Sequence, residues 1–180
     1  MERSLTLVAL FAALIAVLGL FPSFMLFGGV PISAQSLGVM LCGTVLGARR
    51  GTLAVGLFLL LVALGLPLLA GGRGGLGVFV GPTAGFLVGF PVAAFVAGWI
   101  TEHWRGVDLG IAAGAGALIG GVGVLYVFGV AGMMLAAGLS AGQALATLGA
   151  FIPGDIIKAV AAGLVTRALF RARPSAVLTR

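Results

Sequence analysis

Apolar runs extend along the whole chain, and short breaks rich in proline, glycine or arginine separate them. A helix that crosses a bilayer needs about 20 mostly apolar residues. By this measure the pattern predicts an all-α membrane protein with six transmembrane helices, over residues 5–21, 34–47, 52–69, 82–100, 107–130 and 153–170. The second run is short for a straight crossing, unless it begins earlier or the bilayer thins around it.

The breaks predict where helices begin and end. Ser4 is a helix cap before the first run, and Pro153 suits the first turn of the sixth helix. Residues 49–51 (Arg-Arg-Gly) are expected to form the turn before the third run. Residues 131–150 are apolar but interrupted by glycine, serine and glutamine, so we expect a connection with an interfacial helix that starts near Ser140.

Small residues recur at every fourth position in several runs, and such series let helices approach one another closely. The series in the fourth run is Gly81, Gly85, Gly89, Ala93 and Ala97. The series in the fifth run is Ala112, Gly116 and Gly120. In the first run, the pairs are Ala9 with Ala13 and Ala12 with Ala16, which either form a contact face or belong to an ordinary alanine-rich helix.

Composition points to the same class of protein. Of the 180 residues, 61% are hydrophobic and 8% are charged, and the mean hydropathy is +1.28. Soluble domains carry about 25% charged residues, so this chain cannot cover a water-facing surface. We expect a single integral membrane domain over residues 1–180. The net charge of +6 is scattered among apolar segments and forms no basic groove, which argues against a nucleic-acid partner.

The basic residues also predict orientation. With six crossings and a cytoplasmic amino terminus, eight of the ten cations fall on the cytoplasmic side, as the positive-inside rule requires. They are Arg3, Arg49, Arg50, Arg105, Arg167, Arg171, Arg173 and Arg180. We therefore expect a multi-pass protein of the inner (plasma) membrane with both termini in the cytoplasm. Arg73 and Lys158 are the two cations that remain for the outer side.

Residues 70–82 are rich in glycine and carry Arg73. Three of these glycines match the spacing of a dinucleotide-binding fingerprint, but an apolar helix precedes them where that motif requires a strand. Backbone that turns tightly near a ligand or another helix is the better interpretation. His103 has no second metal-type ligand near it in the sequence, so we expect neither a metal site nor a cofactor.

The ionisable residues inside the predicted bundle form the candidate site. Asp155 and Lys158 lie three residues apart on one face of the sixth helix, and Arg73 belongs to the same outer side. Ionisable residues within a membrane are energetically costly and usually functional. Two cations and one acid could hold an anionic solute through charge-assisted hydrogen bonds. The alternative is that Asp155 and Lys158 pair only with each other, while Arg73 extends outward to water.

Three stretches of the chain resemble the BioY family, the biotin-binding S components of energy-coupling factor (ECF) vitamin transporters. They are PISAQSLGVMLCGTVLG at 31–47, GLPLLAGGRGGLGVFVGPTAGFLVGFPVAAFVAG at 65–98, and IPGDIIKA at 152–159. The proline, acid and lysine of the family pattern are present as Pro153, Asp155 and Lys158. Its glycine-flanked arginine is present as Arg73.

This resemblance implies a six-helix S component that binds biotin from outside. It would deliver the vitamin by docking on a transmembrane coupling protein (EcfT- or BioN-like) driven by ATPase subunits (EcfA- or BioM-like). The biotin carboxylate would meet Arg73 or Lys158, and its ureido N–H groups would meet Asp155. Weaker candidates near the pocket are Gln35, Thr83 and Tyr126. The implied docking residues on the first helix are Ala9, Ala13 and Ala16.

Two other functional classes remain as alternatives. An integral membrane enzyme would use Asp155 and Lys158 as acid and base, but one histidine and four acids in the whole chain are few for a catalytic site. A solitary biotin uptake protein or facilitator would work without the ATPases, as a homo-oligomer built on the small-residue faces.

Overall fold

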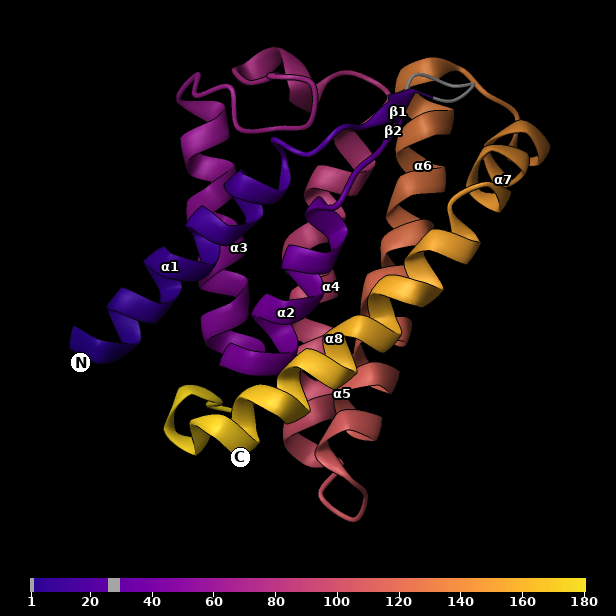
Figure 1. Ribbon diagram of the computed structural model, residues 1–180. Helices are drawn as coiled ribbons and strands as arrows, with labels where there is room; N and C mark the ends of the chain where they lie inside the picture. The colour runs from indigo at the N-terminus through magenta and orange to yellow at the C-terminus, as the bar shows by residue number, and fades with distance from the viewer. Residues whose placement is uncertain (1, 26–29) are drawn as a thin grey trace.

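The computed structural model describes residues 2–25 and 30–180, which form a bundle of helices (Figure 1). The α-helices are α1 (Glu2–Leu18), α2 (Gln35–Leu46), α3 (Ala48–Ala63), α4 (Ala84–His103), α5 (Leu109–Leu118), α6 (Leu125–Ala137), α7 (Ala141–Gly149) and α8 (Ile152–Ala172). A π-helical stretch, η2 (Ile119–Val124), joins α5 to α6. The short 3-10 helices are η1 (Leu76–Phe79) and η3 (Pro174–Ala176), and the two-residue strands β1 (Phe24–Met25) and β2 (Pro31–Ile32) pair antiparallel. The predicted all-α class is confirmed, with this strand pair as a small addition.

Each of the six predicted spans corresponds to a helix of the bundle. Two helices, Ala84–His103 and Leu109–Ala137, are long and apolar enough to cross a membrane. A third candidate span arises if α7 and α8, which bend by 56° at a short break, are taken together. The helix α2 is apolar but shorter. Apolar helices of a membrane protein are therefore observed, while the number of six crossings stays a prediction.

Two predicted helix starts were wrong, and for α3 the reason is a glycine conformation that the apolar pattern does not show. The turn before α3 is made by Gly47, which has a φ of +88°, and residues 49–51 lie inside the helix. A side chain at Gly47 would collide with the carboxylate of Glu102, whose Oε1 accepts a hydrogen bond from the Ala48 amide at 3.1 Å. Ser4 is likewise not a cap, because α1 begins at Glu2.

Other boundaries agree better with the sequence. Helix α8 begins at Ile152 with Pro153 in its first turn, one residue before the predicted start. Helix α7 begins at Ala141, and the Ser140 hydroxyl accepts from the Gln143 amide in a capping box, so the predicted start near Ser140 is confirmed. The segment before it was wrongly assigned, because α6 continues through residue 137.

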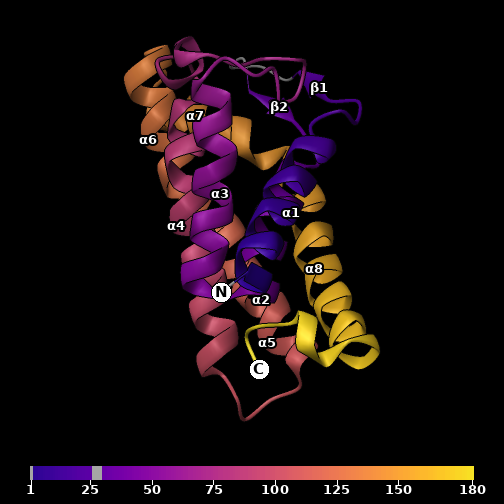
Figure 2. The ribbon, with the colours of Figure 1, turned by 90° about the vertical axis from the view of Figure 1, so that its left-hand side faces the viewer.

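The centre of the bundle is built on close contacts between small residues. Figure 2 shows α3, α4 and α6 on one side and α1 and α8 on the other, and α2 packs against members of both groups. A Cβ atom added at Gly85 would lie 2.1 Å from the Phe128 carbonyl oxygen, and one at Gly120 would lie 2.5 Å from the Ala93 carbonyl oxygen. The predicted packing faces of the fourth and fifth runs are thus confirmed at these positions. Gly81 is an exception, since no atom of the described residues lies within 4 Å of its added Cβ.

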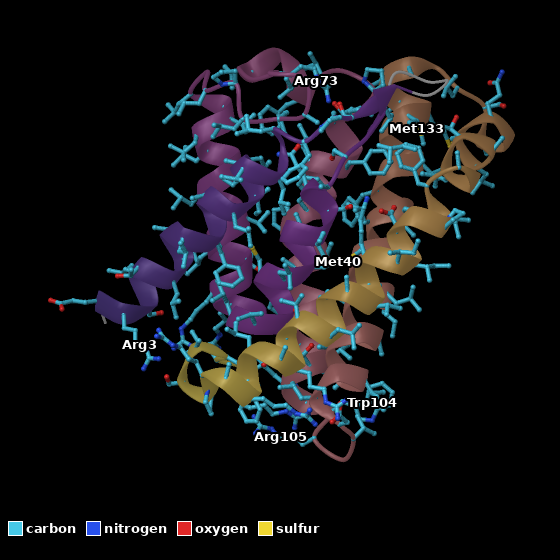
Figure 3. All side chains as sticks on the ribbon, in the orientation of Figure 1. Arg3, Met40, Arg73, Trp104, Arg105 and Met133 are labelled. Carbon is cyan, nitrogen blue, oxygen red and sulfur yellow. The ribbon has the colours of Figure 1, made fainter. Side chains whose placement is uncertain are left out.

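Arginines at the two ends of the bundle come from different parts of the chain. Arg3, Trp104 and Arg105 lie at the end that also carries both chain termini, whereas Arg73 lies at the opposite end (Figures 1 and 3). This separation agrees with the predicted division of the cations. The side of the membrane that each end faces stays a prediction.

Candidate functional site

A cavity at the Arg73 end of the bundle contains every residue predicted for the site. It lies between the loop that joins α3 to α4, the strand β2, and the helices α2, α4, α6 and α8. The predicted residues that line it are Gln35, Arg73, Thr83, Tyr126, Asp155 and Lys158. The empty volume is about 560 Å³, a figure that includes the open mouth.

The carboxylate of Asp155 is the centre of the polar side of the cavity. Asp155 is 4% exposed and lies in the first turn of α8, two residues after Pro153. Its Oδ1 accepts from Lys158 Nζ at 2.7 Å and from Ser36 Oγ at 3.3 Å, and its Oδ2 accepts from the Tyr126 hydroxyl at 2.8 Å. A buried carboxylate needs such partners, because an unpaired charge is strongly disfavoured away from water.

All three N–H groups of the Lys158 ammonium are already used. Besides Asp155, Nζ donates to the Ser33 carbonyl oxygen at 2.8 Å and to Ser36 Oγ at 3.0 Å. Asp155 and Lys158 do form the ion pair that the alternative expected, but the pair also bonds to Ser33, Ser36 and Tyr126, and Arg73 lines the same cavity. The ion pair lies on the cavity wall, so it is also part of the surface that a ligand would meet.

Arg73 is held differently from Lys158. Its Nε donates to the Ala70 carbonyl oxygen at 3.1 Å, while its terminal nitrogens make no hydrogen bond to any residue that the structure describes. Partial burial lowers the pKa of the guanidinium from its ordinary value, yet an arginine stays charged at neutral pH. The side chain thus brings to the cavity a positive charge whose terminal donors are unused by residues 2–25 and 30–180.

The glycine-rich loop turns tightly, as the sequence predicted. Gly71, Gly72 and Gly75 have φ angles of +79°, +69° and +82°, a region that residues with a Cβ atom rarely occupy. Within the turn, the Leu69 amide donates to the Arg73 carbonyl oxygen at 3.0 Å. The glycines therefore shape the backbone that carries Arg73, and the structure shows no dinucleotide-binding strand before them.

Gln35 and Thr83 border the cavity in contrasting ways. The Gln35 amide bonds to backbone groups, namely the carbonyl oxygens of Ile15 and Leu68 and the N–H of Ala70. Thr83 is 6% exposed, and its hydroxyl makes no hydrogen bond within residues 2–25 and 30–180. Thr83 has spare hydrogen-bonding capacity toward the cavity, whereas Gln35 has little.

Aromatic side chains form the apolar side of the cavity. Phe86 and Phe90 come from α4, and Phe151 precedes α8. The rings of Phe86 and Phe151 stack with their centroids 6.5 Å apart. The site therefore combines an apolar wall with a few polar groups, which is typical of small-molecule sites.

Sequence reasoning missed Ser33, Ser36 and the phenylalanines as cavity residues. Ser33 lies just before α2 and Ser36 is its second residue, and their distance from Asp155 along the chain gives no sign of contact. The phenylalanines look like any other apolar residue of a span. Only the approach of α2, α4 and α8 brings these groups together.

The predicted docking residues lie away from this cavity. Ala9 and Ala13 are exposed on α1 and Ala16 is half-buried, while Ala12 faces the interior at 3% exposure. His103 is at the opposite end, stacked on Trp99 with its Nδ1 2.8 Å from the Trp99 carbonyl oxygen. Among the described residues, no group of His, Cys, Asp and Glu could hold a metal ion.

The family model described as "BioY family" matches residues 2–175. The chain belongs to the BioY family. It is 54% identical to the biotin transporter BioY of Rhodobacter capsulatus, over 100% of both chains. It is also 52% identical to the biotin transporter BioY of Rhizobium etli, over 96% of this chain and 95% of the relative.

A solved structure agrees with this assignment of the fold. The crystal structure of the S-component for biotin from an ECF-type ABC transporter is 31% identical and has a TM-score of 0.89, over 94% of this chain and 92% of that one. The fold of this BioY chain is therefore that of an ECF S component, as the resemblance implied.

Proposed function

We propose that this BioY protein is the biotin-binding S component of an ECF transporter, which captures biotin from outside the cell and delivers it inward. The observation that carries the proposal is the cavity at the Arg73 end, in which charged groups from the α3–α4 loop and from α8 face an aromatic wall. Its relatives are named biotin transporters, and its structural neighbour is the S-component for biotin. The chemistry of the cavity suits that ligand.

Charge matching supports an anionic ligand with one carboxylate. Arg73 and Lys158 contribute two positive charges and Asp155 contributes one negative charge, which leaves one positive charge unbalanced. The ammonium of Lys158 is already surrounded by three acceptors, whereas the terminal nitrogens of Arg73 are unused among the described residues. In the proposed complex, Arg73 therefore binds the valerate carboxylate through its planar pair of donors.

The ureido ring would then lie against the polar cluster around α8. One lone pair of Asp155 Oδ2 remains after the bond from Tyr126, and it can accept a ureido N–H. Lys158 holds the Asp155 carboxylate in place, and Thr83 offers a further hydroxyl. The bicyclic ring system would pack on Phe86 and Phe151. Gln35 borders this site.

Transport requires partners that this chain does not contain. In the proposed assembly, a transmembrane coupling protein docks on the exposed small residues of α1, namely Ala9 and Ala13 with the half-buried Ala16, and ATPase subunits drive the cycle. Small residues support such docking because they let another helix approach closely. The domain would span residues 1–180 in the inner membrane, with six crossings and both termini in the cytoplasm.

Biotin retention is the direct test of the proposal. Protein purified in detergent from cells grown with biotin should carry the vitamin in close to one-to-one ratio, measured by mass spectrometry after denaturation. Arg73→Ala protein prepared in parallel should carry much less. Wild-type protein that neither retains biotin nor binds added labelled biotin would refute the proposed function.

The docking surface has its own test. Ala13→Leu adds bulk to the exposed face of α1 and leaves the cavity untouched, so biotin binding by the purified variant should be unchanged while cellular uptake falls at least about tenfold. Leu10→Ala, at an exposed neighbouring position, is the control and should retain uptake. Uptake in cells that lack every coupling ATPase would instead favour a solitary transporter.

A further inference from the structure

A buried glutamine joins three segments that are far apart in the sequence. Gln35, the first residue of α2, is 3% exposed. Its Nε2 donates to the Ile15 carbonyl oxygen of α1 at 3.2 Å and to the Leu68 carbonyl oxygen at 3.0 Å, while its Oε1 accepts from the Ala70 amide at 3.0 Å. We call Gln35 and these three backbone groups the Gln35 joint.

The loop side of the joint leads directly to Arg73. The Ala70 amide bonds to Gln35, and the carbonyl oxygen of the same residue accepts from Arg73 Nε at 3.1 Å. Leu69 and Arg73 pair across the turn through their backbones. A displacement of Ala70 would therefore move the guanidinium that faces the cavity.

On the α1 side of the Gln35 joint, a glycine lets the end of the helix lie close to the loop. A Cβ atom added at Gly19, just past the end of α1, would lie 2.5 Å from the Leu68 carbonyl oxygen and 2.8 Å from Gln35 Nε2. Any other residue there would push the loop away from the helix. Glycine thus allows the end of α1 to touch the same loop segment that Gln35 holds.

We infer that Gln35 is a positioning residue that couples α1 to the Arg73 loop, so that the placement of α1 controls how long the ligand stays in the cavity. This inference rests on the proposed function, because the ligand is taken to be biotin and α1 is taken to be the docking helix. Ile15 is adjacent to Ala16, so a shift of α1 against a docked partner would pull on the Ile15 carbonyl oxygen. Through Gln35, that shift would draw Ala70 and Arg73 away from the bound carboxylate.

The matched pair of variants is Gln35→Met and Gln143→Met, which make the same chemical change at a buried and at an exposed glutamine. Gln35→Met keeps the volume but leaves the Leu68 and Ala70 backbone groups without their partner. Release of labelled biotin from the purified variant should be about tenfold faster than from wild type. Gln143→Met alters only the cap of α7 and should release biotin at the wild-type rate.

Hydrogen exchange supplies the readout that separates coupling from simple support of the loop. In wild type, biotin should slow amide exchange both in residues 68–73 and at the end of α1, in residues 16–20, which do not line the cavity. In Gln35→Met, biotin should still slow exchange in the loop but no longer in residues 16–20. Faster release with unchanged protection of residues 16–20 would overturn the coupling, as would unchanged release.

A second variant keeps the inference testable if Gln35→Met does not fold. Gly19→Ala places a methyl group against Leu68 and Gln35 from the helix side, so it should also release biotin faster and lose protection of residues 16–20. Wild-type values in both measurements would overturn the inference. Failure of wild-type protein to bind biotin is a separate result, because it would refute the proposed function before either variant is compared.

Discussion

The two ends of the bundle bury polar side chains in different ways. At the Arg73 end, an ammonium, a carboxylate and a guanidinium surround a cavity. At the opposite end, the buried polar side chains are neutral hydroxyls. Thr166 Oγ1 donates to Thr44 Oγ1 at 2.9 Å, and Thr179 Oγ1 donates to the Thr44 carbonyl oxygen at 3.0 Å.

This difference distinguishes a packing contact from a candidate binding site. The threonine cluster is uncharged, fully buried and bonded within the protein, so it joins α2, α8 and the carboxyl-terminal tail without offering anything to a ligand. The cavity keeps a net positive charge, and the terminal nitrogens of Arg73 are unsatisfied among the described residues. Such an arrangement is unfavourable in an apolar surrounding unless a solute or water completes it.

The largest expected effect comes from Lys158→Ala, which leaves the Asp155 carboxylate buried without its cation. Removing one partner of a buried ion pair typically lowers the free energy of unfolding by about 3 kcal/mol or more. We expect a clear loss of thermal stability in detergent and no measurable biotin binding. The double variant Lys158→Met/Asp155→Asn removes both charges and should recover stability but not binding. If the single variant keeps wild-type stability and affinity, the ion pair contributes neither to stability nor to biotin binding.

Arg73→Ala should produce the next largest effect, and it should act on binding alone. Loss of a charge-assisted pair of hydrogen bonds should weaken biotin affinity about 100-fold or more, measured by titration of purified protein. Thermal stability without biotin should change little, because Arg73 lies at the cavity mouth in a loop.

The ligand can be varied to identify what Arg73 binds. Wild-type protein should bind biotin much more tightly than biotin methyl ester, which has no carboxylate charge. In Arg73→Ala this preference should disappear. If the preference persists, another group holds the carboxylate and Lys158 is the remaining candidate.

The smallest effect is expected at the opposite end, from Thr166→Val. This change removes one buried hydrogen bond at nearly constant volume, so the free energy of unfolding should fall by about 1 kcal/mol. Biotin affinity should stay within about twofold of wild type, since the threonine cluster does not line the cavity. A large loss of affinity in Thr166→Val would show that the two ends are not independent.

Much of the candidate site could be predicted because charged residues are rare in this chain. Asp155, Lys158 and Arg73 stand out against long apolar runs, and the family motifs around them agree with the cavity that the structure places there. The small-residue series also predicted the close contacts of α4 with its neighbours correctly. In both cases the informative residues differ in type from their surroundings.

Other features of the site and the fold depend on contacts between distant segments or on one backbone angle, and no local sequence pattern shows these. Ser33 and Ser36 became cavity residues only because α2 approaches α8, and the role of Gln35 follows from three backbone groups that converge on one amide. The turn before α3 depends on the positive φ of Gly47, one glycine among 32 in the chain. Apolar periodicity does not single out such a residue.

The sequence by itself determined the class of protein, the helical segments and the charged groups, because burial in lipid forces apolar composition and leaves ionisable residues only where they are used. Tertiary structure alone decided which hydrogen-bond donors are occupied and which remain available. Lys158 and Arg73 carry the same charge. The packing of α2 against α8 adds Ser33 and Ser36 to Asp155 as acceptors for Lys158, whereas the terminal nitrogens of Arg73 bond to none of the described residues. Hydrogen bonding depends on positions within a few tenths of an ångström, and only the packed helices set those positions.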